Sequence, residues 1–452
     1  MQTIFIPIFF GVEAKNILRT DICKKLLEQK DLRIVLFLNN PYKLEYYRRE
    51  FNHPNLIYEV VENYQTPSLN HLFNFLKANL LKTDTTKLRR RLELEASKNY
   101  FKYCAKRIFN ELFARKIFRQ ITRSLYYRLV RDDNFVHYYE KYKPDLVLLA
   151  HLFGNQEISL LRQAKKRKIS TVGLINSWDK ITARSMIVLL PQKLIVHNNI
   201  IKKEAEDYVD MPKKDIFVAG IPHYDYYVTE RRNTYQDFCL KIGADPSRRM
   251  ILYCPIGRHY SDSDSQIIKL LDDILTQGLI PKDIKILVRF PPNDDVEIEK
   301  NFKSDNIIFD RPGIKFSTKR GIDWDMNSDD LTRLADALYH CSLLVCYTSS
   351  MSIDAAVFDK PIINIGFDLK NSKLLSKNPV YYYGWTHYKK LLRSGGIRRV
   401  KNKDELAEWI NKYLNNPQID RAGRAKIVED QCWKLDGKSG ERIAKYLLNS
   451  LA

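Results

Sequence analysis

The sequence lacks the motifs and the long apolar runs that mark several large classes of protein. Its 452 residues contain no GxxxxGK[ST] loop, no GxGxxG after the first strand-like run and no GxSxG. These absences argue against P-loop, nicotinamide-binding and α/β-hydrolase chemistry. No run of 18 uncharged apolar residues exists, so no transmembrane helix is predicted. The N-terminal run MQTIFIPIFF has no basic segment before it, which indicates a first buried strand rather than a signal peptide.

Cysteine is scarce and its spacing is uninformative. The seven cysteines form no CxxC pair, and the close pair Cys341 and Cys346 has no second pair or histidine cluster beside it. This pattern predicts neither a structural zinc site nor a disulfide framework. It favours a reducing cytosol.

Basic residues are abundant in an otherwise ordinary globular composition. Hydrophobic residues make up 44% of the chain and aromatic residues 12%, which excludes wholesale disorder. Lys and Arg number 75 against 54 Asp and Glu, a formal net charge of +21. Such an excess indicates a polyanionic partner: nucleic acid, anionic lipid or a phosphorylated substrate.

About half of the excess charge lies in residues 82–131, which hold fifteen basic and four acidic residues and no Gly or Pro. Apolar residues recur there at helical spacing from Phe101 to Leu125, so the segment is predicted to be a basic amphipathic helical insertion. Its apolar face can pack on its own domain, and its charged face can attract an anionic membrane surface. The two interpretations are compatible.

Elsewhere the pattern alternates short β-rich runs with helical stretches, in two series joined near 222–249. We therefore predict an α/β protein with two Rossmann-like doubly wound domains facing across a cleft. Ligands in such sheets bind at the carboxyl ends of the strands. The predicted domains are an N-terminal acceptor-binding domain (1–225, with the 82–131 insertion), a C-terminal nucleotide-donor-binding domain (226–425) and a C-terminal helix (426–452).

The stretch LLVCYTSSMSIDAAVFDKPIINI is the most informative. A buried strand ends at Cys346, and four hydroxyl residues then open a helix. Free N–H groups and hydroxyls at a helix start suit the diphosphate of a nucleotide donor, and Asp354 in the first turn can accept from a ribose hydroxyl. The alternative is that the hydroxyl run is only an N-cap. The hydroxyl residues predicted to bind the donor are Thr348, Ser349, Ser350 and Ser352.

Cationic and aromatic residues at other strand ends extend this predicted donor site. Arg258 follows the strand in ILYCPIGR and is placed to neutralise a leaving phosphate. Arg289 ends the strand in ILVRFPP, and His387 lies in an aromatic, basic loop. Either arginine can instead be an ordinary structural residue. Asp262 and Asp264 lack a third ligand fixed by spacing, so no metal is predicted.

The N-terminal half supplies the predicted catalytic and acceptor-binding residues, all at or just beyond strand ends. A carboxylate or an imidazole there can act as the base that activates an acceptor hydroxyl. Structural roles at a helix start or a strand end compete with this interpretation. The candidate bases are Glu13, His151 and Asp179, and the candidate acceptor-binding residues are Asn16, Arg19 and Trp178.

Several of these motifs together resemble a known family. The run SSMSIDAAVFDKP is similar to the SS-x3-D-x4-DKP signature of the CDP-glycerol glycerophosphotransferase family. ILYCPIGR, VRFPP and GIPHYD resemble its strand–Pro–x–x–Arg, Lys-x-His-Pro and Gly-x-Pro-Arg-x-Asp elements, in matching order. The wider resemblance is to GT-B glycosyltransferases of bacterial surface-polysaccharide synthesis, carried by SWDK, VHN and DGKSGERIAKYL.

The resemblance implies a GT-B fold, a donor nucleotide held by Ser349, Ser350 and Asp354 with Arg258 near its phosphates, and no metal or other cofactor. Two departures bear on the substrate. Pro291 replaces the family's His and His223 replaces its Arg. Both residues are tied to glycerophosphate transfer in that family, so a sugar donor is predicted.

The predicted function is therefore a glycosyltransferase. It would move a sugar from a nucleotide-sugar donor to a lipid-linked or polysaccharide acceptor. A CDP-glycerol-type glycerophosphotransferase or polyol-phosphate polymerase is the alternative on the same fold. A sugar-nucleotide 2-epimerase ranks lower because the expected Gly-Thr-Arg-Pro-Glu-like start is absent. The sugar, the base, the acceptor and the stereochemistry stay open.

A nucleic-acid-binding protein is the alternative that the charge alone suggests. No RNP-like run, GXXG loop or zinc spacing accompanies the charge, so a nucleic-acid partner is not predicted. Because the charge is concentrated in 82–131, we expect a peripheral protein at the cytoplasmic face of the cell membrane.

Overall fold

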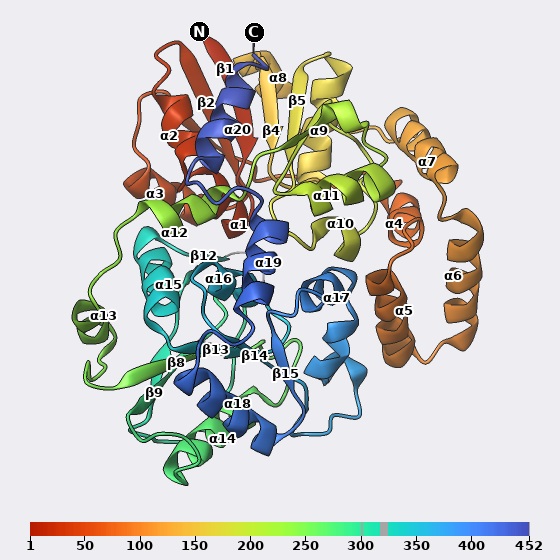
Figure 1. Ribbon diagram of the computed structural model, residues 1–452. Coiled ribbons are helices and arrows are strands. Elements are labelled where there is room, and N and C mark those ends of the chain that lie inside the picture. The colour runs from red at the N-terminus through yellow and green to blue at the C-terminus, as the bar shows by residue number, and fades with distance from the viewer. Residues whose placement is uncertain (300–301, 317–323, 452) are drawn as a thin grey trace. The chain divides into compact units, whose positions relative to one another are not determined.

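The computed structural model describes residues 1–299, 302–316 and 324–451, and the chain divides into two compact units (Figure 1). Unit 1 comprises Met1–Thr229 and Gln431–Ala452, and unit 2 comprises Glu230–Asp430. The division thus falls at 229/230 and 430/431, where the sequence placed boundaries at 225/226 and 425/426. The C-terminal segment belongs to unit 1, so unit 1 is built from two separate stretches of chain.

Unit 1 contains a parallel sheet of doubly wound topology. Its described strands lie in the order β3-β2-β1-β4-β5-β6-β7, and every neighbouring pair is parallel. The order runs outward from β1 in both directions, which places a topological switch point between β1 and β4. The strands are β1 (Gln2–Pro7), β2 (Leu32–Leu38), β3 (Leu56–Val60), β4 (Leu146–Leu149), β5 (Ser170–Leu174), β6 (Lys193–Val196) and β7 (Ile216–Val218).

The helices of unit 1 connect these strands. Residues 16–28 belong to two helices, because the Thr20 hydroxyl accepts a hydrogen bond from the Ile22 amide (3.3 Å) and caps the start of the second one. The helices are α1 (Gly11–Ile17), α2 (Asp21–Leu27), α3 (Pro41–Glu50), α4 (Asn70–Asn79), α5 (Asp84–Ser97), α6 (Tyr100–Phe113), α7 (Lys116–Leu129), α8 (Val136–Tyr142), α9 (Asn155–Lys166), α10 (Lys180–Ala183), α11 (Asn199–Glu204), α12 (Asp225–Thr229) and α20 (Ser439–Leu448).

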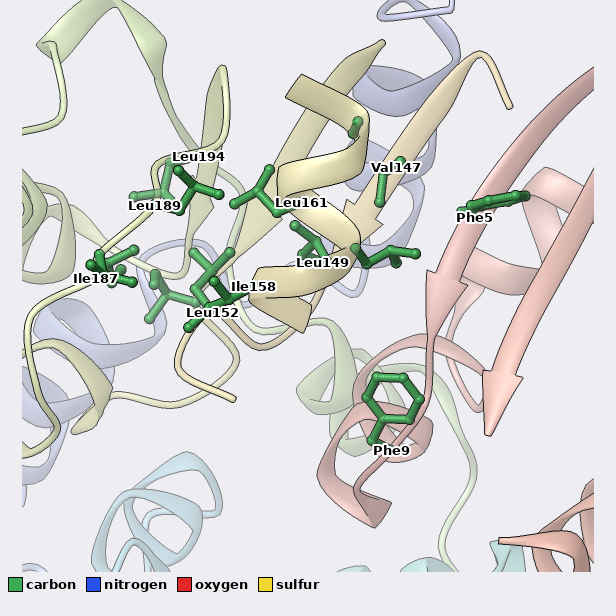
Figure 2. Close-up of a cluster of buried hydrophobic side chains, with 14 of the residues drawn as sticks. Phe5, Phe9, Val147, Leu149, Leu152, Ile158, Leu161, Ile187, Leu189 and Leu194 are labelled. Atoms are coloured by element: carbon green, nitrogen blue, oxygen red, sulfur yellow. The ribbon is translucent and has the colours of Figure 1, made fainter. Parts of the chain in front are cut away.

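The core of unit 1 lies on both faces of the sheet. Successive side chains of a strand point to opposite faces, so Phe5 of β1 joins one buried cluster while Ile4 and Ile6 join the other. Figure 2 shows the first cluster, where Phe5 and Val147 come from the sheet and Leu161 from α9. Near-continuous burial along β1 and β4 is typical of a parallel sheet covered on both faces.

The C-terminal segment ends in two helices rather than the single helix predicted over 426–452. Helix α19 (Arg421–Cys432) stops where Trp433 adopts a φ of 59°, and Gly437 has a φ of 72° before α20 begins. Left-handed residues end a helix because they turn the carbonyl groups out of the helical ladder. Helix α20 is then held by the Asp225 carboxylate, which accepts a hydrogen bond from the Gly440 amide (2.7 Å).

The 82–131 insertion consists of three helices, α5, α6 and α7 (Figure 1). The segment contains no Gly or Pro, yet Lys98 adopts a left-handed φ of 52° and ends α5. Asn99 then caps α6, since its side chain accepts a hydrogen bond from the Lys102 amide (2.8 Å). The helical insertion predicted from the composition is therefore confirmed, with two breaks that composition does not reveal.

Helix α7 buries two polar residues, Arg119 and Thr122, beside the aromatic Tyr126. Arg119 and Arg123 both bind the buried Asp210 carboxylate, at 2.5 and 2.7 Å. Burial alone raises the pKa of Asp210, but the hydrogen bonds from the two arginines lower it overall. The apolar side of α7 faces outward, and Ile117 and Leu125 are exposed.

Unit 2 contains a second parallel sheet with the same outward order, β10-β9-β8-β13-β14-β15. Alternate residues of its strands, such as Tyr253, Val345 and Ile363, form one buried cluster. Its strands are β8 (Arg249–Cys254), β9 (Ile284–Arg289), β10 (Ile307–Asp310), β13 (Leu343–Cys346), β14 (Ile362–Ile365) and β15 (Arg398–Val400), with a small antiparallel pair β11 (Ile314–Lys315) and β12 (Trp324–Asp325). Its helices are α13 (Tyr235–Ile242), α14 (Asp264–Thr276), α15 (Ser328–His340), α16 (Met351–Val357), α17 (Thr386–Leu392), α18 (Lys403–Asn415) and most of α19.

The fold prediction is confirmed in its main features. Both units are parallel α/β sheets in the outward order typical of doubly wound folds. Among the helices that the structure describes, none combines the length and apolar character needed to cross a bilayer.

Candidate functional site

In unit 1, the predicted catalytic residues gather at the carboxyl ends of neighbouring strands. Glu13 lies on α1, directly after β1, and His151 follows β4. Strands β1 and β4 are adjacent and parallel, so their carboxyl ends meet at one edge of the sheet. Helix α9 also starts there, and it adds a residue that the sequence analysis did not select, Glu157. We call Glu13, His151 and Glu157 the carboxylate–imidazole cluster.

Glu13 is fully buried, and only one of its two carboxylate oxygens accepts hydrogen bonds from the described residues. Its Oε2 accepts hydrogen bonds from the amides of Phe9 (2.6 Å) and Phe10 (3.0 Å). Its Oε1 is also buried and has no hydrogen-bond partner among the described residues. An unpaired buried oxygen is costly in a structural carboxylate, so it indicates a group that is available for chemistry.

His151 and Glu157 complete the cluster. The Nδ1 of His151 lies 3.3 Å from Oε1 of Glu157, and the ligand atoms of all three residues lie within 4.8 Å of one another. Gly154 makes room for this, because a Cβ at that position would collide with the Glu157 carboxylate. A glutamate in the first helical turn is common for helix stability alone, which is why the sequence did not single out Glu157.

Burial and charge shift the pKa values of the cluster in opposite directions. Burial, with repulsion from Glu157, raises the pKa of Glu13 well above its ordinary value. Burial lowers the pKa of His151, although Glu157 opposes the change. Burial also lowers the pKa of the Lys180 ammonium, which interacts electrostatically with both carboxylates. Carboxylates and imidazoles with shifted pKa values are typical of sites that exchange protons with a substrate.

The same three side chains are ligand types that a divalent cation accepts. The buried Lys180 next to them already supplies a positive charge to the two carboxylates. We therefore interpret the cluster as a proton-sharing group, and metal independence stays a prediction.

The other predicted residues of unit 1 have varied surroundings. Asn16 is buried, and its Oδ1 lies 3.0 Å from Nδ1 of His223. Asp179 accepts a hydrogen bond from the Ser177 hydroxyl (2.5 Å). Arg19 forms a two-pronged ion pair with Glu50 of α3, at 2.5 and 2.8 Å.

Trp178 packs, half-buried, against the cluster of Figure 2. The structure thus brings Glu13 and His151 together, whereas Arg19 forms its ion pair with Glu50. The acceptor-binding roles of Asn16, Arg19 and Trp178 stay predictions.

In unit 2, Arg258 lines a cavity of ≈150 Å³ beyond the carboxyl end of β8. Its side chain is exposed and forms an ion pair with Glu297. The pKa of Asp264 is raised to about 6 by burial, although the Gly257 amide donates to its carboxylate (2.8 Å). The residues that line this cavity are Arg258, Ser261, Asp262, Asp264, Ser265, Val296, Glu297 and Lys370.

The hydroxyl run after β13 divides between capping, packing and exposure. The Ser349 hydroxyl accepts a hydrogen bond from the amide of Met351 (3.2 Å), the first residue of α16, and Ser350 is the N-cap residue. The Ser352 hydroxyl is buried, 3.0 Å from the Tyr388 hydroxyl. Ser350 is exposed, and the buried Thr348 hydroxyl has no hydrogen-bond partner among the described residues. One hydroxyl of the run therefore bonds to the start of α16, and the donor-binding roles of Thr348 and Ser350 stay predictions.

The remaining predicted donor residues of unit 2 are buried. Arg289 forms an ion pair with Asp310 on the neighbouring strand and donates to the Asp330 carbonyl (2.9 Å). Asp354 is buried in the first turn of α16. His387 is buried in α17, with its ring 5.4 Å from that of Trp385. Their donor-binding roles stay predictions.

The DKP motif has a structural function of its own. Asp359 adopts a left-handed φ of 51°, and its carboxylate binds Arg424 (2.8 Å) and Arg421 (3.0 Å) of α19. Arg424 is almost fully buried and also donates to the carbonyls of Ile419 and Pro417. The motif therefore anchors the start of α19 within unit 2.

Known structures share this fold. The wall teichoic acid polymerase TagF aligns with a TM-score of 0.55 and 12% identity, covering 100% of this chain and 89% of that chain. MnaA of S. aureus, in complex with UDP, aligns with a TM-score of 0.55 and 12% identity, covering 100% and 98%. UDP-GlcNAc 2-epimerase of Neisseria meningitidis, bound to UDP-GlcNAc, gives 0.56 and 9%, covering 99% and 100%. At these identities the likeness shows the fold, and the predicted GT-B fold is confirmed.

Sequence comparison identifies the family. No curated protein sequence matches the chain. A profile of the family described as CDP-Glycerol:Poly(glycerophosphate) glycerophosphotransferase matches residues 52–449, which is most of the chain and includes segments of both units. The chain therefore belongs to the CDP-glycerol:poly(glycerophosphate) glycerophosphotransferase family.

Proposed function

We propose that the protein transfers a sugar from a nucleotide-sugar donor to a lipid-linked or polysaccharide acceptor in surface-polymer synthesis. The observation that carries the proposal is the carboxylate–imidazole cluster, because transfer to a hydroxyl acceptor needs a group that takes the hydroxyl proton. Membership of a transferase family supports the reaction class. The UDP and UDP-GlcNAc in structures of the same fold support a nucleotide-activated donor.

Among the three candidate bases, His151 fits the role best. Burial lowers its pKa, so the imidazole is neutral and basic near pH 7. Glu157 lies behind Nδ1 and can orient the ring and stabilise the imidazolium that forms. Burial raises the pKa of Glu13, so its carboxyl holds a proton over a wider pH range and is less available to accept one.

In the proposed step, His151 takes the proton of the acceptor hydroxyl while the oxygen of that hydroxyl forms a bond to the transferred sugar. The bond between that group and the nucleotide breaks, and the nucleotide leaves with the bonding electrons. Within unit 2, Arg258 is exposed at the cavity and can offset the charge of a phosphate bound there. Thr348 and Ser350 supply hydroxyls beyond the neighbouring strand β13.

Transfer of glycerophosphate from CDP-glycerol is the second candidate, and the family match favours it. Pro291 and His223, which replace the family's His and Arg, favour the sugar. In this chain, Nδ1 of His223 lies within hydrogen-bond distance of Oδ1 of Asn16. The two candidates share the acid–base step and differ in the donor.

A donor panel tests the proposal. The purified protein is heated with nucleotide sugars, free nucleotides and CDP-glycerol, and each mixture is assayed for nucleotide release. A true donor at 100 times its Kd adds about 2.7 kcal/mol of stability. Protection by a nucleotide sugar supports the first candidate, and protection by CDP-glycerol alone supports the second. Protection by no nucleotide overturns both, and unchanged turnover in EDTA supports metal independence.

We also propose that the protein works at an anionic membrane surface, which binds the outward face of α4, α6 and α7. Phe101 is 85% exposed and Ile117 is 55% exposed, and such residues rarely gather on a surface that faces only water. Figure 1 shows α6 and α7 at the outer edge of unit 1. The exposed large apolar residues of this face are Leu69, Leu72, Phe75, Tyr100, Phe101, Ile108, Leu112, Ile117, Ile121, Leu125 and Leu129.

The positive charge of the same helices favours an anionic bilayer as the surface that this face binds. Basic side chains that are exposed beside the apolar residues are Lys102, Arg107, Arg115, Lys116 and Arg128. Apolar residues flanked by Lys and Arg are typical of helices that lie in the membrane interface. Each basic residue near an anionic surface contributes about 1 kcal/mol.

Sedimentation with vesicles tests the membrane proposal. We expect binding to phosphatidylcholine vesicles that contain 30% phosphatidylglycerol, reduced about tenfold or more in R115E/K116E. K24E/K25E on α2 is the control with the same charge change outside this face. Equal binding of the two variants would refute the assignment, as would a dimer in solution that buries the apolar residues.

A further inference from the structure

A cavity of unit 1 lies between α5 and α6, apart from the carboxylate–imidazole cluster. Its volume is ≈350 Å³, which exceeds the ~30 Å³ share of one water molecule about tenfold. Three of its lining side chains are basic, and one, Glu93, is acidic. The lining residues are Arg90, Glu93, Leu94, Ala96, Ser97, Asn99, Lys102, Tyr103 and Lys106.

Arg90 is the buried charge of this cavity, with 7% of its surface exposed. Its Nη2 donates to Oδ1 of Asn110 (3.0 Å). Asn110 is itself fixed, because its amide nitrogen donates to the carbonyls of Asn79 (2.6 Å) and Leu81 (2.8 Å). The other terminal nitrogen of Arg90, Nη1, is buried and has no hydrogen-bond partner in the described part of the chain.

The two glutamates whose charges act on Arg90 form ion pairs with lysines instead. Glu93 forms an ion pair with Lys106 (2.5 Å), and Glu111 forms one with Lys82. A guanidinium buried in this way without a carboxylate of its own is costly, since burial penalises its charge. An anion that enters the cavity would supply the missing partner.

Lys102 adds a second cation at the surface. It is exposed, lines the cavity, and its ammonium forms no ion pair with any residue that the structure describes. Arg and Lys together are the residues that bind phosphate oxygens through charge-assisted hydrogen bonds.

We propose that the cavity between α5 and α6 binds a phosphate group, with Arg90 as its buried partner and Lys102 as its exposed one. The phosphate can belong to an anionic lipid headgroup or to a soluble phosphate ester. Helix α6 also carries the exposed Phe101 and Ile108, so a headgroup would enter beside the apolar face. Only this lipid source rests on the proposed membrane association; the phosphate site stands without it.

The experiment measures the affinity for inorganic phosphate by calorimetry, and in parallel the affinity for vesicles with 30% phosphatidylglycerol. The variants are Arg90→Gln, Lys102→Ala and the control Lys87→Ala, an exposed lysine of α5 outside the cavity lining. Loss of a charge-assisted hydrogen bond predicts about tenfold weaker binding in R90Q and in K102A, with K87A unchanged. Because Lys102 is exposed, K102A keeps the test valid if R90Q fails to fold.

Weaker phosphate binding in R90Q and K102A supports the site and a soluble source. Weaker vesicle binding in the same two variants, relative to K87A, supports the site and a lipid source. The proposed phosphate site is overturned if the wild type binds neither phosphate nor vesicles, or if all the variants bind equally. Thermal protection by nucleotides is recorded on the same samples, so that failure of the proposed transfer function is seen separately.

Discussion

Nδ1 of His151 lies 3.3 Å from Oε1 of Glu157, and Glu157 is almost fully buried. The pair joins the loop after β4 to the first turn of α9, two segments that Gly154 allows to approach. A buried carboxylate beside an imidazole changes both the orientation and the basicity of the ring. The consequences for rate and for stability can be measured separately.

Replacing Glu157 with Gln should slow transfer and change its pH dependence. The negative charge of Glu157 raises the pKa of His151 against the lowering effect of burial. Without that charge the pKa of His151 falls further, so the acid limb of the rate profile moves to lower pH. Turnover should fall about 10²-fold, because the imidazolium loses its partner. Steady-state rates between pH 5 and 9, with Gln156→Ala as the control on α9, test this, and an unshifted profile would contradict it.

Replacing Glu13 with Gln should stabilise the protein. The pKa of Glu13 is raised, so the folded state loses stability as pH rises from the ordinary value of 4.5 through the folded value. Gln removes this loss, and its oxygen can still accept from the amides of Phe9 and Phe10. A gain of about 1 kcal/mol corresponds to a Tm about 2–4 °C higher.

Calorimetry at pH 8 and at pH 5 tests the Glu13 prediction, with the larger gain expected at pH 8. Glu13→Gln should also keep more activity than His151→Gln, since His151 is the proposed base. The reverse order of activities would assign the base to Glu13.

His197 should make the protein sensitive to acid. Burial lowers the pKa of this imidazole to about 4, from an ordinary value of 6.5. Between these two pH values His197 is protonated in the unfolded chain but not in the folded protein. The free energy of unfolding therefore falls as the pH drops, by up to about 1.4 kcal/mol per pH unit. Urea midpoints at pH 7.5 and pH 5 should therefore lie closer together in His197→Gln. The exposed His71, replaced in the same way, should leave the difference unchanged.

Replacing Asp210 with Asn should strongly destabilise unit 1. Asp210 holds both Arg119 and Arg123, and the side chains of Asp210 and Arg119 are almost fully buried. Loss of one partner leaves buried guanidinium groups uncompensated and costs about 3–5 kcal/mol. Asp207→Asn breaks an exposed pair with Lys203 and should cost less than about 1 kcal/mol. Equal urea midpoints for the two variants would disprove the role of Asp210.

Much of the fold could be predicted because buried strands carry a strong local signal. The alternation of β-rich and helical runs predicts the two parallel sheets, and the buried strand predicted to end at Cys346 is β13 (Leu343–Cys346). The short edge strand Arg398–Val400 was not predicted, since two of its three residues are arginines. The break at Lys98 depends on a left-handed backbone that a lysine rarely adopts, so sequence gave no sign of it.

The candidate site could be predicted where strand ends identify it, as for Glu13 and His151. Glu157 was missed because its role depends on the approach of two segments, which Gly154 permits. Helix α7 shows a different limit. Its periodicity reveals two faces, but the inward one includes two arginines because Asp210, which is far away in the sequence, lies there.

The two-part construction of unit 1 has a consequence for biosynthesis. Ile443 and Leu447 of α20 cover the face of the sheet that contains Ile4 and Ile6. A ribosome makes that sheet first, then all of unit 2, and only then residues 431–452. Because domains fold as they emerge, the apolar surface that α20 covers stays exposed during the synthesis of about 200 residues. Nascent chains should therefore recruit chaperones until α20 emerges, and a ribosome stalled before residue 431 should leave an aggregation-prone product.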